Sequence, residues 1–174
     1  MIHLIEGARN SGKTFLVNSL KTDLNYKFDF VHWVGKLDIV NKHKELHQFS
    51  LAKEIMLHDL NKKGFINTIV SDRGMFTVLS WAVLEKRISE QECYDQLEAF
   101  TEHGLFKNTN IVYIEGNNPD KRKEKDFWSD EVKNKEKEIL EKFIKTYEMD
   151  FGGSVRFFEN RFDDDSIKRF KNIF

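Results

Sequence analysis

The sequence contains one cysteine and one proline among its 174 residues. A single cysteine, Cys93, excludes a disulfide bond within the chain and is typical of a protein that works in a reducing compartment. With one proline and no stretch rich in proline, glycine or serine, the chain offers no linker at which to divide it. We therefore predict a single domain over residues 1–174.

Long apolar runs and an excess of charge of one sign are also missing. No apolar run is long enough to span a bilayer, and the N-terminus lacks a basic segment followed by an apolar stretch. The formal net charge is −1, so no overall field attracts the chain to nucleic acid or to a membrane. We therefore expect a cytoplasmic protein without a membrane partner, in which any anion-binding site is local.

Strand-like and helix-like patterns alternate from one end of the chain to the other. The predicted strands cover residues 1–6, 26–34, 65–72, 108–116 and 154–160, and the predicted helices cover 14–24, 49–64, 75–88, 89–104, 130–149 and 164–174. This alternation predicts a three-layer α/β/α fold with a five-stranded parallel sheet. In such sheets ligands bind at the carboxyl ends of the strands.

A glycine-rich loop directly follows the first predicted strand. Its residues are Gly7, Ala8, Arg9, Asn10, Ser11, Gly12, Lys13 and Thr14. The two glycines permit the tight backbone that lets successive N–H groups hold phosphate oxygens, and the following helix adds its positive end. Lys13 is placed to reach the outer phosphates of ATP, and Thr14 to hold Mg²⁺. The pattern predicts a nucleotide-binding P-loop.

A second constellation, Asp72-Arg73, ends the third predicted strand. Asp72 can hold Mg²⁺ through water or accept a proton from the attacking oxygen. Arg73 can grip a phosphate with its planar guanidinium. The alternative is a surface ion pair, but the position beside the phosphate loop favours function.

Two basic features remain open at this stage. The segment 117–128 contains Lys121, Arg122 and Lys125, and it is either a lid that closes over the phosphates or a solvated run of charge. Arg9 lies inside the phosphate loop, where it reaches a phosphate, like an arginine finger supplied in cis, points to solvent, or pairs with a nearby carboxylate.

Together these segments resemble the P-loop kinases of the thymidylate kinase and deoxynucleoside kinase type. The matching stretches are GARNSGKT, then SDRG followed by a helix, then PDKRKEKD. The resemblance implies that the P-loop binds ATP, that Thr14 and Asp72 organise Mg²⁺, and that Lys13, Asp72, Arg73 and Arg122 serve catalysis. Lys121 and Lys125 would add to the charge of the lid. Arg9 stands where thymidylate kinases usually have aspartate, and Gly74 where they have tyrosine.

Three functions are compatible with these residues. The leading hypothesis is a kinase that uses ATP and Mg²⁺ to phosphorylate a small-molecule nucleotide or nucleoside. The second is a kinase for the 5′ end of a nucleic acid, which the balanced charge does not favour. The third is an ATPase or a nucleotide-dependent interaction module, with Glu115 as the hydrolytic carboxylate. The sequence leaves the oligomeric state open, a homodimer included.

Overall fold

Five parallel strands form the centre of the molecule. The computed structural model describes residues 1–23, 28–32, 46–65, 68–116 and 129–174. The strands are β1 (Ile2–Glu6), β2 (Asp29–His32), β3 (Ile69–Asp72), β4 (Thr109–Glu115) and β5 (Val155–Glu159). Their order in the sheet is β2-β3-β1-β4-β5, and every neighbouring pair is parallel. The predicted α/β fold with a parallel sheet is confirmed.

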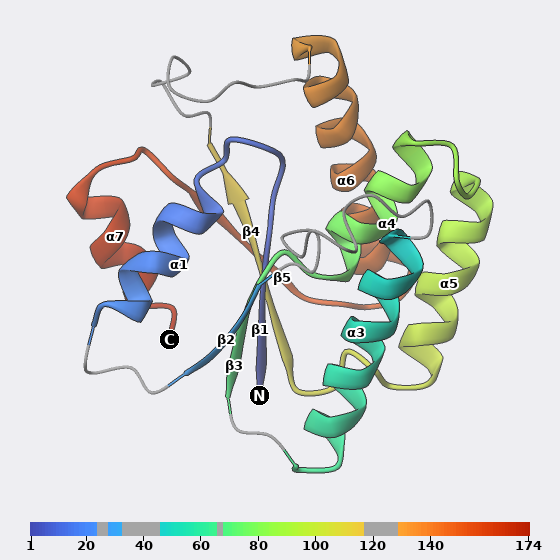
Figure 1. Ribbon diagram of the computed structural model, residues 1–174, viewed down its shortest axis with the longest axis horizontal. Helices are drawn as coiled ribbons and strands as arrows, with labels where there is room; N and C mark the ends of the chain where they lie inside the picture. The colour runs from blue at the N-terminus through green and yellow to red at the C-terminus, as the bar shows by residue number, and fades with distance from the viewer. Residues whose placement is uncertain (24–27, 33–45, 66–67, 117–128) are drawn as a thin grey trace.

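Helices cover both faces of this sheet (Figure 1). The helices α1 (Lys13–Lys21) and α7 (Asp164–Lys171) lie on one side, and they contact each other. The other side carries α3 (Leu46–Lys62), α4 (Met75–Leu84), α5 (Glu90–Glu102) and α6 (Asp130–Asp150). The order of layers is therefore helix, sheet, helix.

Alternate residues of the central strands supply a separate hydrophobic core on each face. Leu4, Ile111 and Tyr113 pack with the four-helix side, whereas Ile5 and Val112 pack with α1 and α7. Strands buried on both faces have no polar side, which explains why Leu4-Ile5 of β1 and residues 111–114 of β4 read as continuous apolar runs. Among the described residues, no helix is long and apolar enough to cross a membrane.

Helix ends follow the local chemistry of the sequence. Ser89 caps α5 through a capping box with Glu92, as the serine and the glutamate three residues later predict. Gly64 adopts a positive φ of 75° just beyond α3, as expected of a helix-ending glycine. The helix predicted to run to residue 88 instead ends at Leu84, since Lys86 takes a positive φ of 58°.

One predicted strand also begins later than its pattern suggested. The third strand was expected from residue 65, but β3 starts at Ile69 and the Phe65 side chain is 74% exposed. Phe65 N–H donates to the Leu60 carbonyl at 3.0 Å, so this residue completes the end of α3. The backbone hydrogen bond of Phe65 therefore places this apolar residue at the end of α3 and not in β3.

Candidate active site

The predicted site lies at the carboxyl edge of the sheet, where three neighbouring strands end. β1 pairs with β3 on one side and with β4 on the other. The loop of residues 7–12 follows β1, Arg73 and Gly74 follow β3, and Gly116 follows β4. Parallel strands bring these three connections to the same edge, as the order of motifs in the sequence predicted.

The phosphate loop has a backbone that only glycine permits at two positions. Gly7 has φ 142° and Gly12 has φ 86°. A Cβ atom on Gly7 would lie 2.5 Å from the Ile114 carbonyl oxygen, and one on Gly12 would collide with the Asn160 carboxamide. The two glycines therefore allow the loop to pack directly against β4 and against the connection that follows β5.

Lys13 is the first residue of α1, and its ammonium group turns back into the loop. It donates to the carbonyl oxygens of Gly7 and Ala8, both at 2.6 Å, and to the Ser11 hydroxyl at 3.2 Å. The side chain is buried, and this burial, together with the nearby Arg73 charge, lowers the pKa of Lys13 to about 7. The buried Lys13 side chain is thus held by two backbone carbonyls and one hydroxyl of the loop.

Thr14 and Asp72 meet beside this lysine. The Thr14 hydroxyl donates to Asp72 Oδ2 at 2.8 Å, although the two residues are 58 positions apart in the chain. Asp72 is buried, and its other oxygen, Oδ1, has no hydrogen-bond partner. A hydroxyl and a carboxylate with an unused buried oxygen fit a hard divalent cation such as Mg²⁺, which prefers oxygen ligands.

Two arginines of the site, Arg9 and Arg73, lie over the ring of Trp81. The guanidinium carbons of Arg9 and Arg73 lie 4.7 Å and 5.3 Å from the centre of its ring. Its indole N–H donates to Glu136 Oε1 at 2.5 Å, and Arg9 Nε lies 3.4 Å from Glu136 Oε2. Of the alternatives for Arg9, which were a phosphate, solvent or a carboxylate, pairing with a carboxylate is the one observed here.

Glu136 also influences the other cations. It is 1% exposed, and its charge opposes the lowering of the pKa of Lys13 and of Arg73, in both of which burial is the largest cause. One carboxylate on α6 is therefore the counter-charge of three cations that come from different elements.

Glu6 is a second buried acid that the sequence reasoning missed. It ends β1 and accepts hydrogen bonds from the backbone N–H groups of Phe76 and Thr77, each at 3.2 Å, and from the Thr77 hydroxyl. The carboxylate thereby caps the N-terminus of α4. Burial nevertheless raises the pKa of Glu6. The sequence does carry a signal for Glu6, since an acid that directly follows the buried apolar pair Leu4-Ile5 in a strand is unusual.

Trp81, Glu136 and Asn160 were not singled out from the sequence either. Glu136 stands in a helix with acids and lysines on every side, so no pattern distinguishes it. Trp81 belongs to an apolar helix in which an aromatic side chain is ordinarily core. The packing of α4 against α6 brings Trp81 and Glu136 to the loop, whereas Asn160 comes to it at the end of β5.

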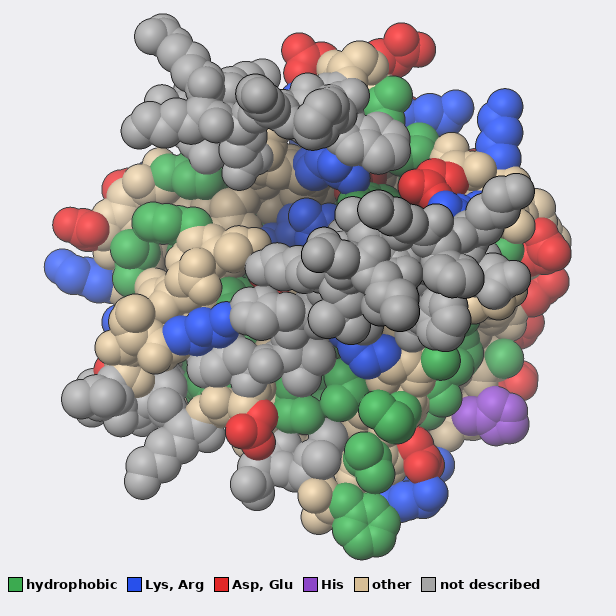
Figure 2. Space-filling model, viewed as in Figure 1, with side chains coloured by type: hydrophobic (Ala, Val, Ile, Leu, Met, Phe, Trp, Pro, Cys, Tyr) green, Lys and Arg blue, Asp and Glu red, His purple; other side chains and the backbone are tan. Residues whose placement is uncertain are grey.

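A polar hollow of about 270 Å³ opens beside the loop. Its lining includes Arg9, Asn10, Gly116, Lys133, Asn134 and Lys137. Figure 2 shows lysine and arginine side chains gathered in a depression on this face. The cations here come from the loop after β1 and from the first turns of α6, where Asp130 also lines the hollow and pairs with Lys133.

The basic residues of the predicted lid, Lys121, Arg122 and Lys125, lie outside the described residues, and so does the whole range 117–128. Their roles stay predictions. Glu115 ends β4 with its side chain exposed, and its carbonyl oxygen accepts from Asn160 N–H at 2.7 Å.

Comparison with known proteins identifies the architecture. No model of a known protein family matches the sequence, and no curated protein matches it. Solved structures do match over nearly the whole chain. A deoxyadenosine kinase from M. mycoides with bound dCTP is 18% identical, covers 99% of this chain and 98% of its own, and superposes with a TM-score of 0.59. This chain shares its fold with deoxyadenosine kinase.

Two further structures of deoxyadenosine kinase from M. mycoides give the same result. One has the products dCMP and a flexible dCDP bound, and the other has dATP bound. Each is 16% identical with a TM-score of 0.58, and each covers 99% of this chain and 98% of its own. The correspondence with deoxyadenosine kinase therefore covers nearly the whole length of both chains.

Proposed function

We propose that this protein is a kinase that uses ATP and Mg²⁺ to phosphorylate a nucleoside or nucleotide. The observation that carries the proposal is the Lys13 ammonium group held inside the Gly7–Gly12 loop, next to the Thr14–Asp72 pair. Phosphoryl transfer depends on positioning and on neutralising charge, and these residues supply both. The shared fold of deoxyadenosine kinase supports the same class of reaction.

Each residue has a role that follows from its place. Lys13 exchanges its carbonyl partners for the outer phosphates, because an anion is a stronger partner than a neutral carbonyl. Thr14 and Asp72 would hold Mg²⁺, which when bound neutralises the phosphate oxygens. Arg73 and Arg9 extend the positive charge toward the transferring group. Lys121, Arg122 and Lys125 would close over it as a short lid.

The first acceptors to test are deoxynucleosides. The similar structures are named for deoxyadenosine and carry dCTP, dATP or dCMP with dCDP, which are deoxyadenosine and deoxycytidine nucleotides. We propose deoxyadenosine and deoxycytidine as acceptors for this chain, with their monophosphates as the next class.

The test is an acceptor screen with ATP labelled at the γ-phosphate. The protein and Mg²⁺ are mixed with each nucleoside, each deoxynucleoside, their monophosphates and an oligonucleotide with a 5′ hydroxyl, and the products are separated. We expect label on one class of monomer. Label on the oligonucleotide would favour the nucleic-acid alternative, and free phosphate alone would favour an ATPase.

Two variants connect the activity to the site. Lys13→Ala should abolish transfer and weaken ATP binding, and Asp72→Asn should lower the rate by about 10²-fold or more. Lys107→Ala is the matched control, since Lys107 is an exposed lysine that follows α5. Melting temperatures confirm that each variant is folded. Undiminished transfer by Lys13→Ala would overturn the assignment of the site.

A further inference from the structure

The connection between β5 and α7 contacts the phosphate loop directly. Asn160, the first residue after β5, is 4% exposed. Its carboxamide Nδ2 donates to the Ser11 carbonyl oxygen at 2.9 Å, although the two residues are 149 positions apart. Its Oδ1 accepts from Phe162 N–H at 3.0 Å. Both ends of the carboxamide are therefore committed.

The surrounding backbone is shaped around this side chain. A Cβ atom on Gly12 would collide with Asn160 Nδ2, and one on Gly116 would lie 2.9 Å from the Asn160 carbonyl oxygen and 3.0 Å from that of Ser11. Glycine at these two places leaves room for Asn160 between the loops that follow β1 and β4. The contact therefore depends on three segments of the chain: the loop after β1, the start of the connection after β4, and the connection after β5.

The bond to Ser11 fixes one peptide plane of the loop. In a trans peptide the carbonyl oxygen of one residue and the N–H of the next point in opposite directions. Because Asn160 holds the Ser11 carbonyl, the Gly12 N–H points away from the β5–α7 connection. This N–H directly precedes Lys13 and belongs to the set of amides that a P-loop offers to phosphate.

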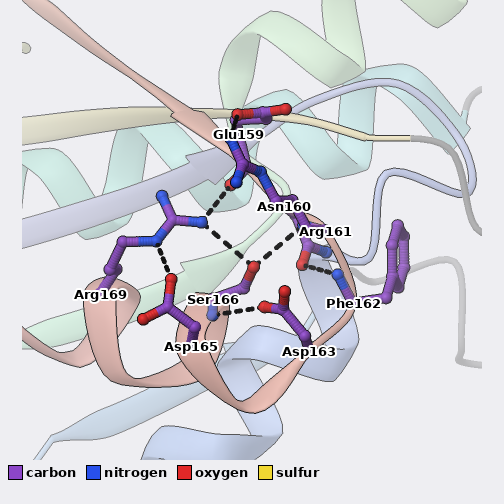
Figure 3. A network of polar contacts seen from close by, with 8 residues as sticks. All are labelled: Glu159, Asn160, Arg161, Phe162, Asp163, Asp165, Ser166 and Arg169. Carbon is purple, nitrogen blue, oxygen red and sulfur yellow. Dashed lines mark hydrogen bonds and ion pairs between the residues drawn. The ribbon is translucent and has the colours of Figure 1, made fainter.

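The connection itself is held by bonds that do not touch the phosphate loop, as Figure 3 shows. Asp163 Oδ1 accepts from Ser166 N–H at 2.7 Å, and the Ser166 hydroxyl accepts from Arg161 N–H at 3.0 Å. Arg169 Nε lies 2.9 Å from Asp165 Oδ2. The shape of the connection and its bond to the loop can therefore be perturbed separately.

We propose that Asn160 is a positioning residue, which orients the Ser11–Gly12 peptide so that the loop binds nucleotide phosphates. This inference rests on the proposed function, since it assigns to that site a residue from a distant part of the chain. Asn160 acts through the loop backbone rather than by touching the substrate. Its contribution should appear in nucleotide affinity and not only in stability.

The test compares Asn160→Asp with Ser166→Ala. Aspartate has nearly the same shape and still accepts from Phe162 N–H, but it replaces the Nδ2 donor by an oxygen that repels the Ser11 carbonyl. Asn160→Ala removes the donor without adding charge, and it serves if the aspartate variant does not fold. Ser166→Ala weakens the connection and leaves the bond to Ser11 in place.

Calorimetric titration with Mg²⁺–ADP and with pyrophosphate gives the affinity, and thermal melting gives the stability. We expect Asn160→Asp and Asn160→Ala to weaken both ligands at least about tenfold, and Ser166→Ala to leave both affinities unchanged even where the melting temperature falls as far. Equal affinities in the wild type and in both Asn160 variants would overturn the inference and leave the proposed function standing. Failure of the wild type to bind either ligand would instead overturn the proposed function, and the inference with it.

Discussion

At the residue scale, the site depends on a lysine that is costly to keep charged. Lys13 is buried, and its ammonium group has carbonyl and hydroxyl oxygens as its hydrogen-bond partners, with Arg73 near enough to repel it. Burial lowers its pKa from 10.5 to about 7, so the folded protein binds this proton less tightly than an unfolded chain does. Its contribution to stability therefore increases as the pH rises from about 7 toward 10.5.

Nucleotide binding should reverse this shift. Phosphate anions favour the ammonium form, so the pKa of Lys13 rises on binding and the complex takes up a proton at pH 8. Calorimetry at pH 8 in two buffers of different ionisation enthalpy measures this uptake, which we expect to approach one proton per ADP bound. Lys13→Arg is the control, because arginine stays protonated throughout and its complex should take up none. A wild-type heat that is the same in both buffers would contradict the prediction.

At the scale of elements, the site is held together by contacts between helices and loops that are distant in sequence. α4 packs against both α3 and α6, which places Trp81 of α4 beside Glu136 of α6. The P-loop joins this pair through Arg9, and the end of β3 joins it through Arg73. One buried carboxylate thus links α6, the helix after the predicted lid, to the loop that follows β1.

Glu136→Gln should destabilise the free protein more than the nucleotide complex. Glutamine can still accept from the Trp81 indole, but Arg9, Arg73 and Lys13 lose a buried counter-charge, at a cost of about 3 kcal/mol in the free energy of unfolding. Bound phosphate supplies negative charge, so ADP should stabilise the variant more than it stabilises the wild type. Urea unfolding with and without Mg²⁺–ADP measures both effects. Glu138→Gln, at an exposed position of the same helix, is the control.

At the scale of the whole molecule, a histidine is buried on each of the two faces of the sheet. His3 lies 4.7 Å from the ring of Phe174 and 5.9 Å from that of Phe28, on the side of α1 and α7. His58 of α3 bonds to the Leu105 carbonyl at 2.6 Å and packs on Phe106, on the other side. Burial lowers the pKa of both to about 4. Both are therefore neutral in the folded protein at neutral pH.

These histidines predict sensitivity to mild acid. Below the ordinary pKa of 6.5 the unfolded chain binds protons that the folded protein excludes, so stability falls as the pH drops from 6.5 toward 4. Each histidine contributes a slope of up to about 1.4 kcal/mol per pH unit. Urea unfolding between pH 7 and 5 should show this loss, and His58→Gln should reduce the slope. An unchanged slope in that variant would remove His58 from the account, and exposed His103→Gln is the control.

The sequence by itself determined the parts of this protein that depend on local spacing. Alternating patterns predicted the order of strands and helices, the capping box predicted the start of α5, and the glycine-rich stretch predicted the loop that joins β1 to α1. The parallel sheet then required the P-loop and Asp72 to share one edge, and the Thr14–Asp72 bond shows them together. These features follow from chain chemistry and from the geometry of parallel strands.

Only the tertiary structure decided which distant residues complete the site. Trp81 and Glu136 reach it because α4 packs on α6, and Asn160 reaches it because β5 ends beside the P-loop. Glu6 already ends β1 beside the loop, and the fold gives it the N-terminus of α4 as its partner. No local pattern distinguishes Glu136 among the charges of α6, or Asn160 in a polar connection. Burial is what gives them their roles, since a carboxylate or carboxamide that is withdrawn from water must find a partner in the protein.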